Sequence, residues 1–556
     1  MKRSRAILEL CAAGLAGALL VLPLRPAHAQ ADLSHLDDAK MVPRGEWRLS
    51  AVSAWSRFDS RFAGGTAADS TFPLGADFSF DSLGVAQLPA LAGTQNAIQT
   101  LTGSPFRLSL GATRAAMDAR VVVTPISVEY GLMRRLTIGL MLPLVRTRMT
   151  LQMRVNPNGT EGNVGINPAT VNTTALAQDS AVVQQLVNAS AALQSSLQAC
   201  EANASANANC GTLLARQQDV TSLLQSATQF ATTFGAVYGQ NTDVRGAPVV
   251  PVTGSAADAL VKSRLTAFDS SFQAFMSNTP RITGTPAAAG GVVGYTDLSN
   301  LLADPGIAGY DSLKSTVRIA PGDVELSGRF LLLDQFADSI PSTGPVGLHT
   351  RATFTGTFRL PTGQLAAASN PLDIATGRGA SSVAGQLALY TQWGARFGLS
   401  ATAGYVTSFG KTKTGAFSLA AGAPFPPSTS DAYPYTPGAV TSIQLAPRLM
   451  VTNLLGINAM YDLEHLAANN YGTLPVGATA PVPVTIVDGV RATPGTLQSV
   501  GFGITYSTLS QFDRGRAVLP VDVTYTHLEA LRGSARMPKY FRDQIQVRFY
   551  FRRHHG

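Results

Sequence analysis

FRDQIQVRFYF, residues 541–551, alternates between apolar and polar side chains near the end of this 556-residue chain. One parity holds Ile545, Val547, Phe549 and Phe551, and the other holds Gln544, Gln546, Arg548 and Tyr550. Successive side chains of a strand point to opposite faces, so the stretch predicts a strand with one apolar and one polar face. Its length suits a tilted strand that crosses a membrane in about 9–11 residues. Taken alone, it fits an edge or sandwich strand of a soluble protein equally well.

The first 29 residues predict a secretory signal peptide. Basic residues open the chain, an apolar run covers residues 12–22, and Ala27-His28-Ala29 offers a cleavage site between small residues. Cleavage after Ala29 removes Lys2, Arg3, Arg5, Arg25 and Glu9, so the net charge falls from +8 to +5 (38 basic minus 33 acidic side chains). We therefore expect an exported protein.

The composition excludes several classes of protein. Only 14% of the residues are charged, and the basic ones form no dense run, so the chain is not expected to bind nucleic acid. Cys200 and Cys210 are the cysteines that remain after cleavage, and in an exported protein such a pair predicts a disulfide. No histidine lies near them, which disfavours a metal site, and no cofactor is expected.

Alternating stretches recur along the chain, beginning at Trp47–Trp55. They total about twelve, an even number as single-chain bacterial barrels have. The stretches between them alternate in length, as expected if short turns lie on the periplasmic side and longer loops lie outside. In order, these connections cover 59–118, 131–134, 156–319, 335–346, 361–382, 394–396, 409–440, 452–454, 466–496, 509–515 and 530–541.

The predicted fold is an all-β membrane protein, an antiparallel transmembrane β-barrel of about twelve strands with a large α-helical insertion in the second external loop. The predicted divisions are a signal peptide (1–29), a periplasmic lead-in (30–46), the barrel (47–155 and 320–552), a helical extracellular insertion (156–319) and a C-terminal tail (553–556). Apolar residues recur at helical spacing in three runs of the insertion, near 182–197, 213–224 and 256–276. A partly ordered insertion rich in Ala, Gln and Ser is the alternative.

The parity of each strand sorts its side chains into two sets. Residues opposite the apolar face should line the lumen, where charges of both signs could form ion pairs or select solutes: Glu129, Asp323, Glu325, Arg329, Arg351, Arg359, Arg448, Asp462, Glu464, Asp522 and Arg548. Aromatic residues should form lipid-facing girdles at the two membrane boundaries: Trp47, Trp55, Tyr130, Trp393, Tyr405, Tyr461, Tyr506, Tyr525, Phe549 and Phe551.

Two features resemble known families. The alternating, aromatic-ended last strand resembles the terminal strand of bacterial outer-membrane barrels, which closes the barrel and carries the insertion signal. YGLMRRLTIG at 130–139 and GDVEL at 322–326 resemble outer-membrane transporters of the phenol and aromatic-degradation (meta-pathway) type. The resemblance implies the outer membrane of a Gram-negative-type bacterium, and as partners the lipids of that membrane, its assembly machinery and a small organic solute, apolar ones included. The oligomeric state stays open.

Three functions follow in order of preference. The first is passive or gated passage of small organic solutes, in the manner of a porin. The second is a barrel that anchors a helical insertion for surface recognition or a structural role. The third is an outer-membrane hydrolase with His465, His527, Asp462 and Glu464 at its rim. No nucleophile elbow, P-loop, zinc-protease motif or dinucleotide fingerprint occurs, so the chain is not expected to be an enzyme.

Overall fold

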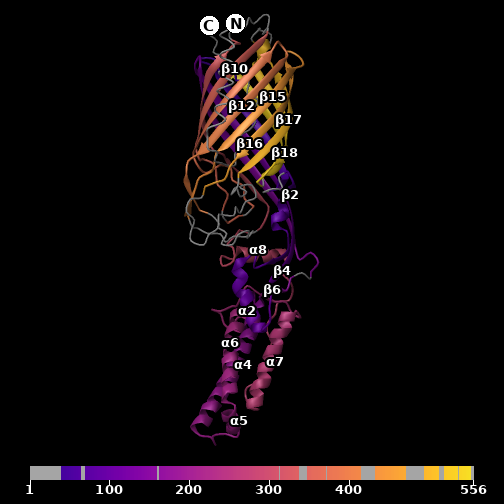
Figure 1. Cartoon of the computed structure of the whole chain (residues 1–556), viewed down its shortest axis with the longest axis vertical. Coiled ribbons are helices and arrows are strands. Elements are labelled where there is room, and N and C mark those ends of the chain that lie inside the picture. The colour runs from indigo at the N-terminus through magenta and orange to yellow at the C-terminus, as the bar shows by residue number, and fades with distance from the viewer. Residues whose placement is uncertain are drawn as a thin grey trace.

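Twelve antiparallel strands form a closed barrel in the computed structural model of the chain (Figure 1). The structure describes residues 39–63, 69–159, 162–311, 313–336, 347–367, 369–370, 372–414, 432–470, 494–512, 519–535 and 537–551. The predicted signal peptide, most of the lead-in and the tail lie outside these residues. The barrel strands are β1 (Trp47–Phe62), β4 (Ser109–Met133), β5 (Leu136–Val155), β9 (Glu325–Asp334), β10 (Leu348–Arg359), β11 (Ser382–Trp393), β12 (Phe397–Ser408), β15 (Val440–Met450), β16 (Leu455–Leu466), β17 (Gly495–Ser507), β18 (Val521–Gly533) and β19 (Pro538–Phe551).

The last strand closes the barrel onto the first. Trp47 of β1 lies opposite Phe551 of β19 on one side and opposite Tyr130 of β4 on the other. Every other wall strand pairs with its neighbours in chain order, as an up-and-down barrel requires. The predicted strand number and the predicted pairing of the last strand with Trp47–Trp55 are therefore confirmed.

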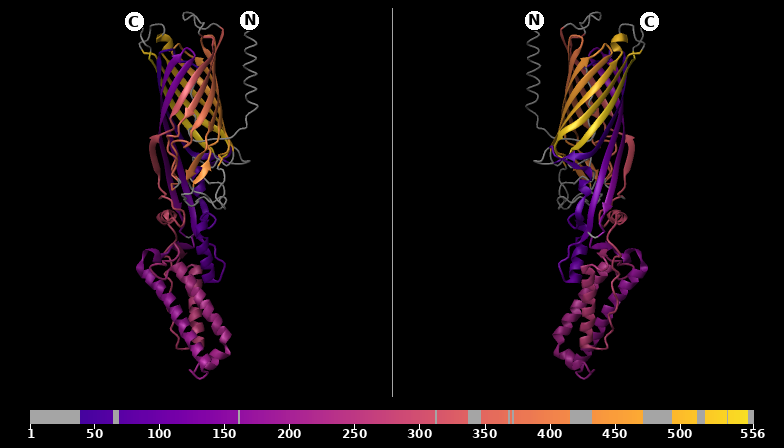
Figure 2. Two further views of the ribbon diagram at one scale, coloured as in Figure 1. Left: turned by 90° about the vertical axis from the view of Figure 1, so that its left-hand side faces the viewer. Right: turned by 90° about the vertical axis from the view of Figure 1, so that its right-hand side faces the viewer.

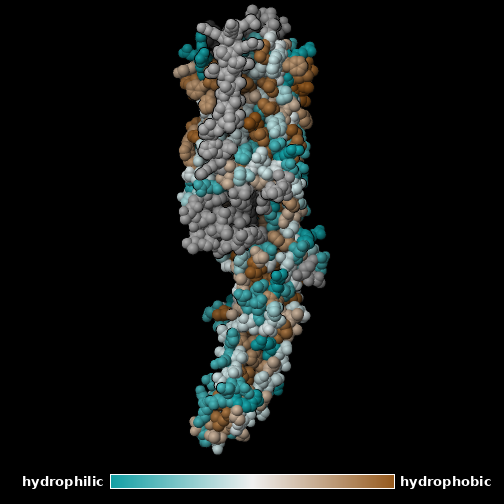
Figure 3. Space-filling model, viewed as in Figure 1, coloured by the Kyte–Doolittle hydropathy of each residue, from teal (hydrophilic) through white to brown (hydrophobic). Residues whose placement is uncertain are grey.

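The wall has an apolar outer surface, visible as the brown areas of the barrel in Figure 3. Large apolar side chains on its outer parity remain exposed, among them Ile138, Leu140, Leu142, Phe354 and Ile504. Such an exposed apolar band covers the outside of barrels that span a membrane. Among the described helices, none is both long and apolar enough to cross a membrane.

The two ends of the barrel differ in their connections. The end where β1 begins and β19 finishes, here called the terminal end, carries short links at 134–135, 394–396 and 451–454. The opposite end, the arm end, carries most of the long connections. One prediction is wrong: β18 and β19 meet at the arm end through only 534–537, because each strand runs further than its apolar pattern suggested.

Strands β4 and β5 leave the barrel at the arm end and continue as a two-stranded stalk (Figure 2). Their pairing runs without a break from Gly131 opposite Thr137 to Thr113 opposite Val155. The predicted connection 59–118 is wrong for 109–118, which belongs to β4 in the stalk, where the outer parity turns polar. β8 (Thr316–Pro321) adds to the outer part of β5 and leads back into the wall. Short pieces around the stalk are β2 (Thr71–Pro73), η1 (Leu74–Phe78), β3 (Phe80–Gly84) and η2 (Pro89–Leu91).

The stalk carries a bundle of helices, here called the arm, whose far tip at α5 points away from the barrel (Figure 1). The predicted helical runs lie in α4 (Thr173–Ala202), in α5 (Cys210–Ala215) with α6 (Gln217–Tyr238), and in α7 (Ala256–Phe275). The remaining elements of the insertion are β6 (Val164–Ile166), α3 (Pro168–Val171), β7 (Val249–Pro251) and α8 (Tyr295–Ala303). β13 (Lys411–Thr414), β14 (Ala432–Tyr435) and α9 (Leu509–Phe512) belong to barrel connections.

The arm buries apolar side chains between its helices. Leu186 and Leu193 of α4, Phe234 of α6 and Phe272 of α7 are fully buried in one cluster. Asn172 caps α4 by accepting from the Thr174 N–H at 2.8 Å, and such caps supply partners for exposed helix N–H groups. Helix α2 (Ala92–Thr102) also packs against α6 and α7, although it belongs to the first connection at this end. The arm is therefore assembled from two loops.

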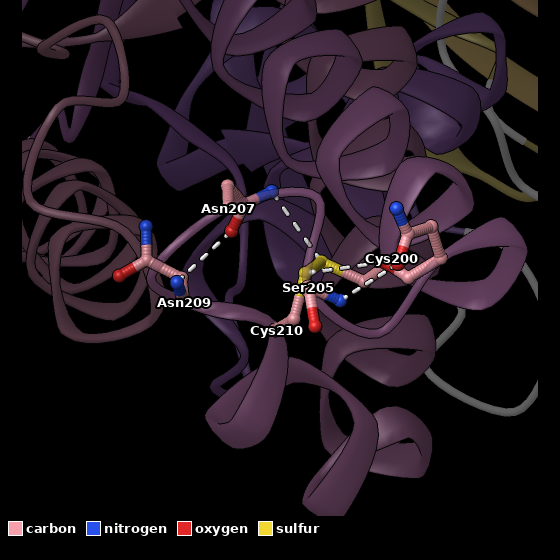
Figure 4. The surroundings of a disulfide bond; sticks show 6 residues. Cys200, Ser205, Asn207, Asn209 and Cys210 are labelled. Carbon is pink, nitrogen blue, oxygen red and sulfur yellow. Dashed lines mark hydrogen bonds between the residues drawn. A yellow bond between two sulfur atoms is a disulfide. The ribbon is translucent and has the colours of Figure 1, made fainter.

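The predicted disulfide between Cys200 and Cys210 is present at the tip of the arm (Figure 4). It joins the end of α4 to the start of α5, with both sulfurs buried. Asn207 in the intervening loop accepts from the Asn209 N–H at 2.9 Å and holds the turn. The bond thus closes the helical hairpin at the place where the bundle has least core.

Candidate functional site

The inner face of the barrel is lined mainly by small polar side chains. They occupy the parity opposite the apolar band and are shielded from outside solvent: Ser50, Thr137, Thr353, Thr355, Ser400, Thr402, Asn458, Thr505, Thr524 and Thr526. A barrel of about eight strands is filled by its side chains, whereas 16–18 strands leave an open channel. Twelve strands lie between these two cases, and small inner side chains occupy less of the interior than large ones would.

Several inner polar atoms have no hydrogen-bond partner in the part of the chain that the structure describes. Thr353 Oγ1, Thr355 Oγ1, Arg448 Nε and both side-chain polar atoms of Asn458 are among them. Buried polar groups are nearly always hydrogen-bonded to protein or water, and leaving one unsatisfied is costly. The inner wall therefore carries polar groups whose hydrogen-bonding capacity the other described side chains do not use.

A charged layer lies near the terminal end of the lumen. Arg48 of β1 donates from Nη2 to Oε1 of Glu129 at 2.8 Å, and the pair joins the first and second strands of the wall. Arg48 and Arg329 both donate to the carbonyl oxygen of Lys40, at 3.3 and 3.4 Å. Arg48 was missed in the sequence, although the parity of its strand places it on the face opposite that of Trp47 and Leu49.

Residues 39–46 lie inside this layer. Ala39 and Val42 are fully buried, and the Val42 N–H donates to Oγ1 of the inward-facing Thr137 at 3.2 Å. The Gly45 N–H donates to the carbonyl oxygen of Gly131 at 2.7 Å. Peptide groups in this last part of the predicted lead-in therefore find partners on the inner wall. The sequence of 39–46 has no regular alternation, so it did not predict that this segment would lie against the inner wall.

Other predicted lumen residues lie on the same inner parity at the terminal end. Asp522 accepts from the Tyr550 hydroxyl at 2.9 Å and from the Ser507 hydroxyl. Arg548 lies opposite Asp522 on the neighbouring strand. Arg351 donates to Asp334 at 3.1 Å. With Arg48 and Glu129, these groups place charges of both signs around the narrow part of the interior.

The remaining predicted lumen residues lie elsewhere. Arg359 and Glu325 pair at 2.5 Å at the arm end, and Asp462 and Glu464 are buried on the inner parity of β16. Asp323 lies in the link between β8 and β9 and is fully buried. It accepts from the N–H groups of Gly363 and Arg378, at 2.9 and 2.7 Å, and so anchors the β10–β11 connection instead of projecting from a wall strand.

The predicted girdle residues all occupy the outer parity. Trp47, Tyr130, Trp393, Tyr506, Phe549 and Phe551 lie towards the terminal end, and Trp55, Tyr405, Tyr461 and Tyr525 lie further along their strands. Trp47 and Trp55 are exposed, as are Trp393 and Phe551. We keep the prediction that these aromatic residues form a girdle at each boundary of the apolar band.

The rim cluster considered for a hydrolase is not brought together. Asp462 and Glu464 face inward, whereas His527 faces outward and stacks near Phe502 with ring centroids 5.4 Å apart. His527 Nδ1 lies 2.9 Å from Asp543 Oδ1, and His465 Nδ1 lies 3.1 Å from Thr496 Oγ1. The four residues lie on opposite faces of the wall, so they do not share one site.

An apolar groove also lies on the outer surface. Trp393, Phe397, Phe502 and Ile504 line it, and Gly503 lies at its base. A side chain at Gly503 would approach the carbonyl oxygen of Tyr525 to 2.6 Å, so the position has no room for one. The groove faces lipid, so the lumen remains the candidate site.

Comparisons with known proteins add structural neighbours. Neither a known family profile nor a curated protein matches the chain. An outer membrane channel from Pseudomonas putida F1 is 9% identical, covers 93% of this chain and 100% of its own, and has a TM-score of 0.38. A Pseudomonas aeruginosa FadL homologue is 9% identical with 91% and 90% coverage and a TM-score of 0.26. The P. putida toluene transporter TodX is 10% identical with 92% and 90% coverage and a TM-score of 0.22. These scores carry no argument about function, which rests on the geometry above.

Proposed function

We propose that the protein is a channel of the outer membrane through which small organic solutes pass. The observation that carries the proposal is the inner face of small polar side chains, such as Thr355 and Asn458, in a closed barrel whose outer face is apolar. A polar lumen that crosses an apolar band would join the two sides of the membrane. The location follows from the closed barrel, because α-helices and closed barrels are the structures that span membranes.

The charged layer and the segment 39–46 would set the size limit of this channel. They lie at the same end, and Lys40 links them through the two arginines that its carbonyl oxygen accepts from. For the cargo we propose small organic molecules, apolar ones included, as the resemblance of 130–139 and 322–326 implies. The similar solved proteins include one described as a toluene transporter, which agrees in substrate class. We assign no catalytic activity.

The test is conductance in planar bilayers with a matched pair of variants. Thr355 and Phe354 are neighbours on β10, but Thr355 faces inward and Phe354 faces lipid, exposed to 42%. Thr355→Trp should lower conductance and the uptake of a monoaromatic hydrocarbon into proteoliposomes, because a bulky ring would occupy the lumen. Phe354→Trp should leave both unchanged.

Heat-modifiable gel migration would show that both variants are folded barrels. Absence of current and uptake for the wild-type protein would overturn the channel. Equal loss in both variants would show that the effect lies in the wall and not in the lumen.

A second function, surface recognition by the arm, has its own observation. Helix α4 is 30 residues long, and at about 1.5 Å per residue it extends roughly 45 Å from the stalk. The disulfide fixes its far tip. A passage alone needs no such structure, so we keep recognition as the alternative role of the chain.

A further inference from the structure

A row of arginines crosses three neighbouring strands on the outside of the barrel. Arg57 of β1 lies opposite Arg120 of β4, and Arg120 lies opposite Arg148 of β5. Arg146 lies on the same face two residues earlier in β5 and is exposed. Like charges directly opposite one another destabilise a sheet, so the row needs an anionic partner.

The chain supplies only part of that partner. Asp118 accepts from both Arg57 and Arg120, at 2.7 and 3.1 Å, so one carboxylate serves two guanidinium groups. Arg146 and Arg148 form no hydrogen bond or ion pair with the residues that the structure describes. Asp59 is the other exposed acidic residue on these three strands, so four arginines face two carboxylates there, while Asp543 and Glu529 lie on the neighbouring strands β19 and β18.

The row lies at the edge of the apolar band. Trp47 and Arg57, Tyr130 and Arg120, and Leu136 and Arg146 are each ten residues apart. Ten residues at about 3.3 Å each, tilted by about 40°, rise roughly 25 Å, which is the height of the apolar band of such barrels. If the girdle residues of the terminal end mark one membrane boundary, the arginines mark the other.

Apolar side chains surround the unpaired arginines. Val317 and Ile319 of β8 lie opposite Arg148 and Arg146, and they are 57% and 72% exposed. Trp55, 41% exposed, lies in the same cross-strand row as Ile319. This surface places cations beside exposed apolar side chains at a membrane boundary. A lipid with a phosphorylated headgroup suits both features, because its phosphates would bind the guanidinium groups and its acyl chains would contact the apolar residues.

We propose that this face binds a phosphorylated lipid of the outer leaflet through Arg146 and Arg148, with Arg57 and Arg120 beside them. The inference rests on the proposed location in the outer membrane, with the arm outside. Because β8 joins the arm to the wall, the bound lipid would hold the base of the arm against the membrane surface. Arginine suits this role, since its planar fork of donors pairs with phosphate in a bidentate manner.

The test compares two pairs of arginines on the same hairpin. Arg146 and Arg148 lie at the arm end, and Arg134 and Arg135 lie exposed in the turn at the terminal end. The full mature chain in nonionic detergent is titrated with bisphosphorylated lipid A, with dephosphorylated lipid A and with inorganic phosphate, and binding is followed by native mass spectrometry. Arg146→Gln/Arg148→Gln should weaken the binding of bisphosphorylated lipid A at least about 10-fold, because each arginine near an anionic lipid surface adds to the free energy of binding.

Arg134→Gln/Arg135→Gln should bind this lipid like the wild type, and neither dephosphorylated lipid A nor inorganic phosphate should bind comparably. Equal binding by the wild type and the Arg146/Arg148 variant would overturn the proposal, as would equal binding of the dephosphorylated lipid. Loss in the turn variant alone would place the terminal end outside and also overturn it. Conductance measured on the same variants separates the lipid site from the channel. Lipid binding by a protein that carries no current would contradict the channel and leave the lipid site intact.

Discussion

Arg48 and Glu129 form the ion pair that joins the first and second strands of the wall. Both side chains are largely buried, and Arg48 is also tied to the segment 39–46 through Lys40. Arg48→Met should destabilise the barrel by about 3–5 kcal/mol, since removal of one partner leaves a buried charge without compensation. Thermal loss of heat-modifiable migration measures the effect.

The double variant Arg48→Met/Glu129→Leu provides the control for this pair. It should recover most of the lost stability, because replacement of a buried pair by apolar residues is often nearly neutral. A double variant as unstable as the single one would show that contacts of Arg48 other than Glu129 carry the effect.

Asp179 in the arm should make the stability of the helices depend on pH. Burial raises the pKa of Asp179 to about 7, while the hydrogen bond from the Ala287 N–H acts in the opposite direction. Folding thus favours the protonated form. Stability is greatest below the ordinary pKa of 3.8 and falls as the pH rises to about 7, by up to about 1.4 kcal/mol per pH unit.

Urea unfolding of the helical signal, followed by circular dichroism at about pH 5 and about pH 8, measures this dependence. The wild-type arm should be less stable at the higher pH, whereas Asp179→Asn should lose most of the difference. Asp243→Asn, at an exposed loop carboxyl, serves as the control and should keep it. An unchanged pH dependence in Asp179→Asn would exclude this carboxyl as its source.

The disulfide links helix α4 covalently to helix α5. Cys200 and Cys210 are separated by ten positions, and a loop of that length corresponds to about 2–3 kcal/mol of chain entropy. Cys200→Ser/Cys210→Ser should therefore loosen the tip, seen as faster hydrogen exchange in α5 and the end of α4. Exchange at Leu186 and Phe272, nearer the middle of the bundle, should change little. Uniform acceleration along the arm would instead mean that the bundle unfolds as one unit.

The closing strand should be sensitive to charge at its last outward residue. Phe551 lies opposite Trp47, is 53% exposed, and ends the aromatic-ended pattern of β19. Phe551→Asp should lower the yield of assembled barrel more than removal of 552–556, because a charge replaces a ring at the membrane boundary. Equal yields of heat-modifiable barrel from the two variants would contradict this role.

Elements with a strict two-residue period were predictable, and elements that depend on tertiary packing were not. Alternation in 541–551 gave both the strand and its faces, and the spacing of the cysteines gave the disulfide. Helix α2 and the segment 39–46 gave no comparable signal. The first is stabilised by α6 and α7 from another loop, and the second by hydrogen bonds to the wall. Asp323 was assigned to the lumen from strand parity alone. Parity does not apply to this residue, because it lies in the link between β8 and β9.

At the scale of the whole molecule, the barrel wall and the arm are held together in different ways. The arm buries Leu186 and Phe272 among helices, whereas the wall is held by a closed ladder of strands and faces lipid. Their link is the stalk of β4 and β5, with β8 beside it. A deletion of the helices should therefore leave the ladder of strands closed, provided that it removes the parts of the arm that come from both loops.

Replacement of 163–311 by a short Gly-Ser linker should leave a barrel that still conducts. Ser315 accepts from the Leu151 N–H at 3.1 Å, so the chain resumes beside the end of β5 and a linker of about six to ten residues can span the gap. That deletion alone would expose Ile98 and Leu101 of α2, which are fully buried in the arm. A companion deletion that also replaces 88–107 should remove this apolar surface and improve solubility at equal conductance. Loss of conductance in both variants, with heat-modifiable migration intact, would assign the arm to the passage itself; unchanged conductance leaves recognition at the cell surface as its role.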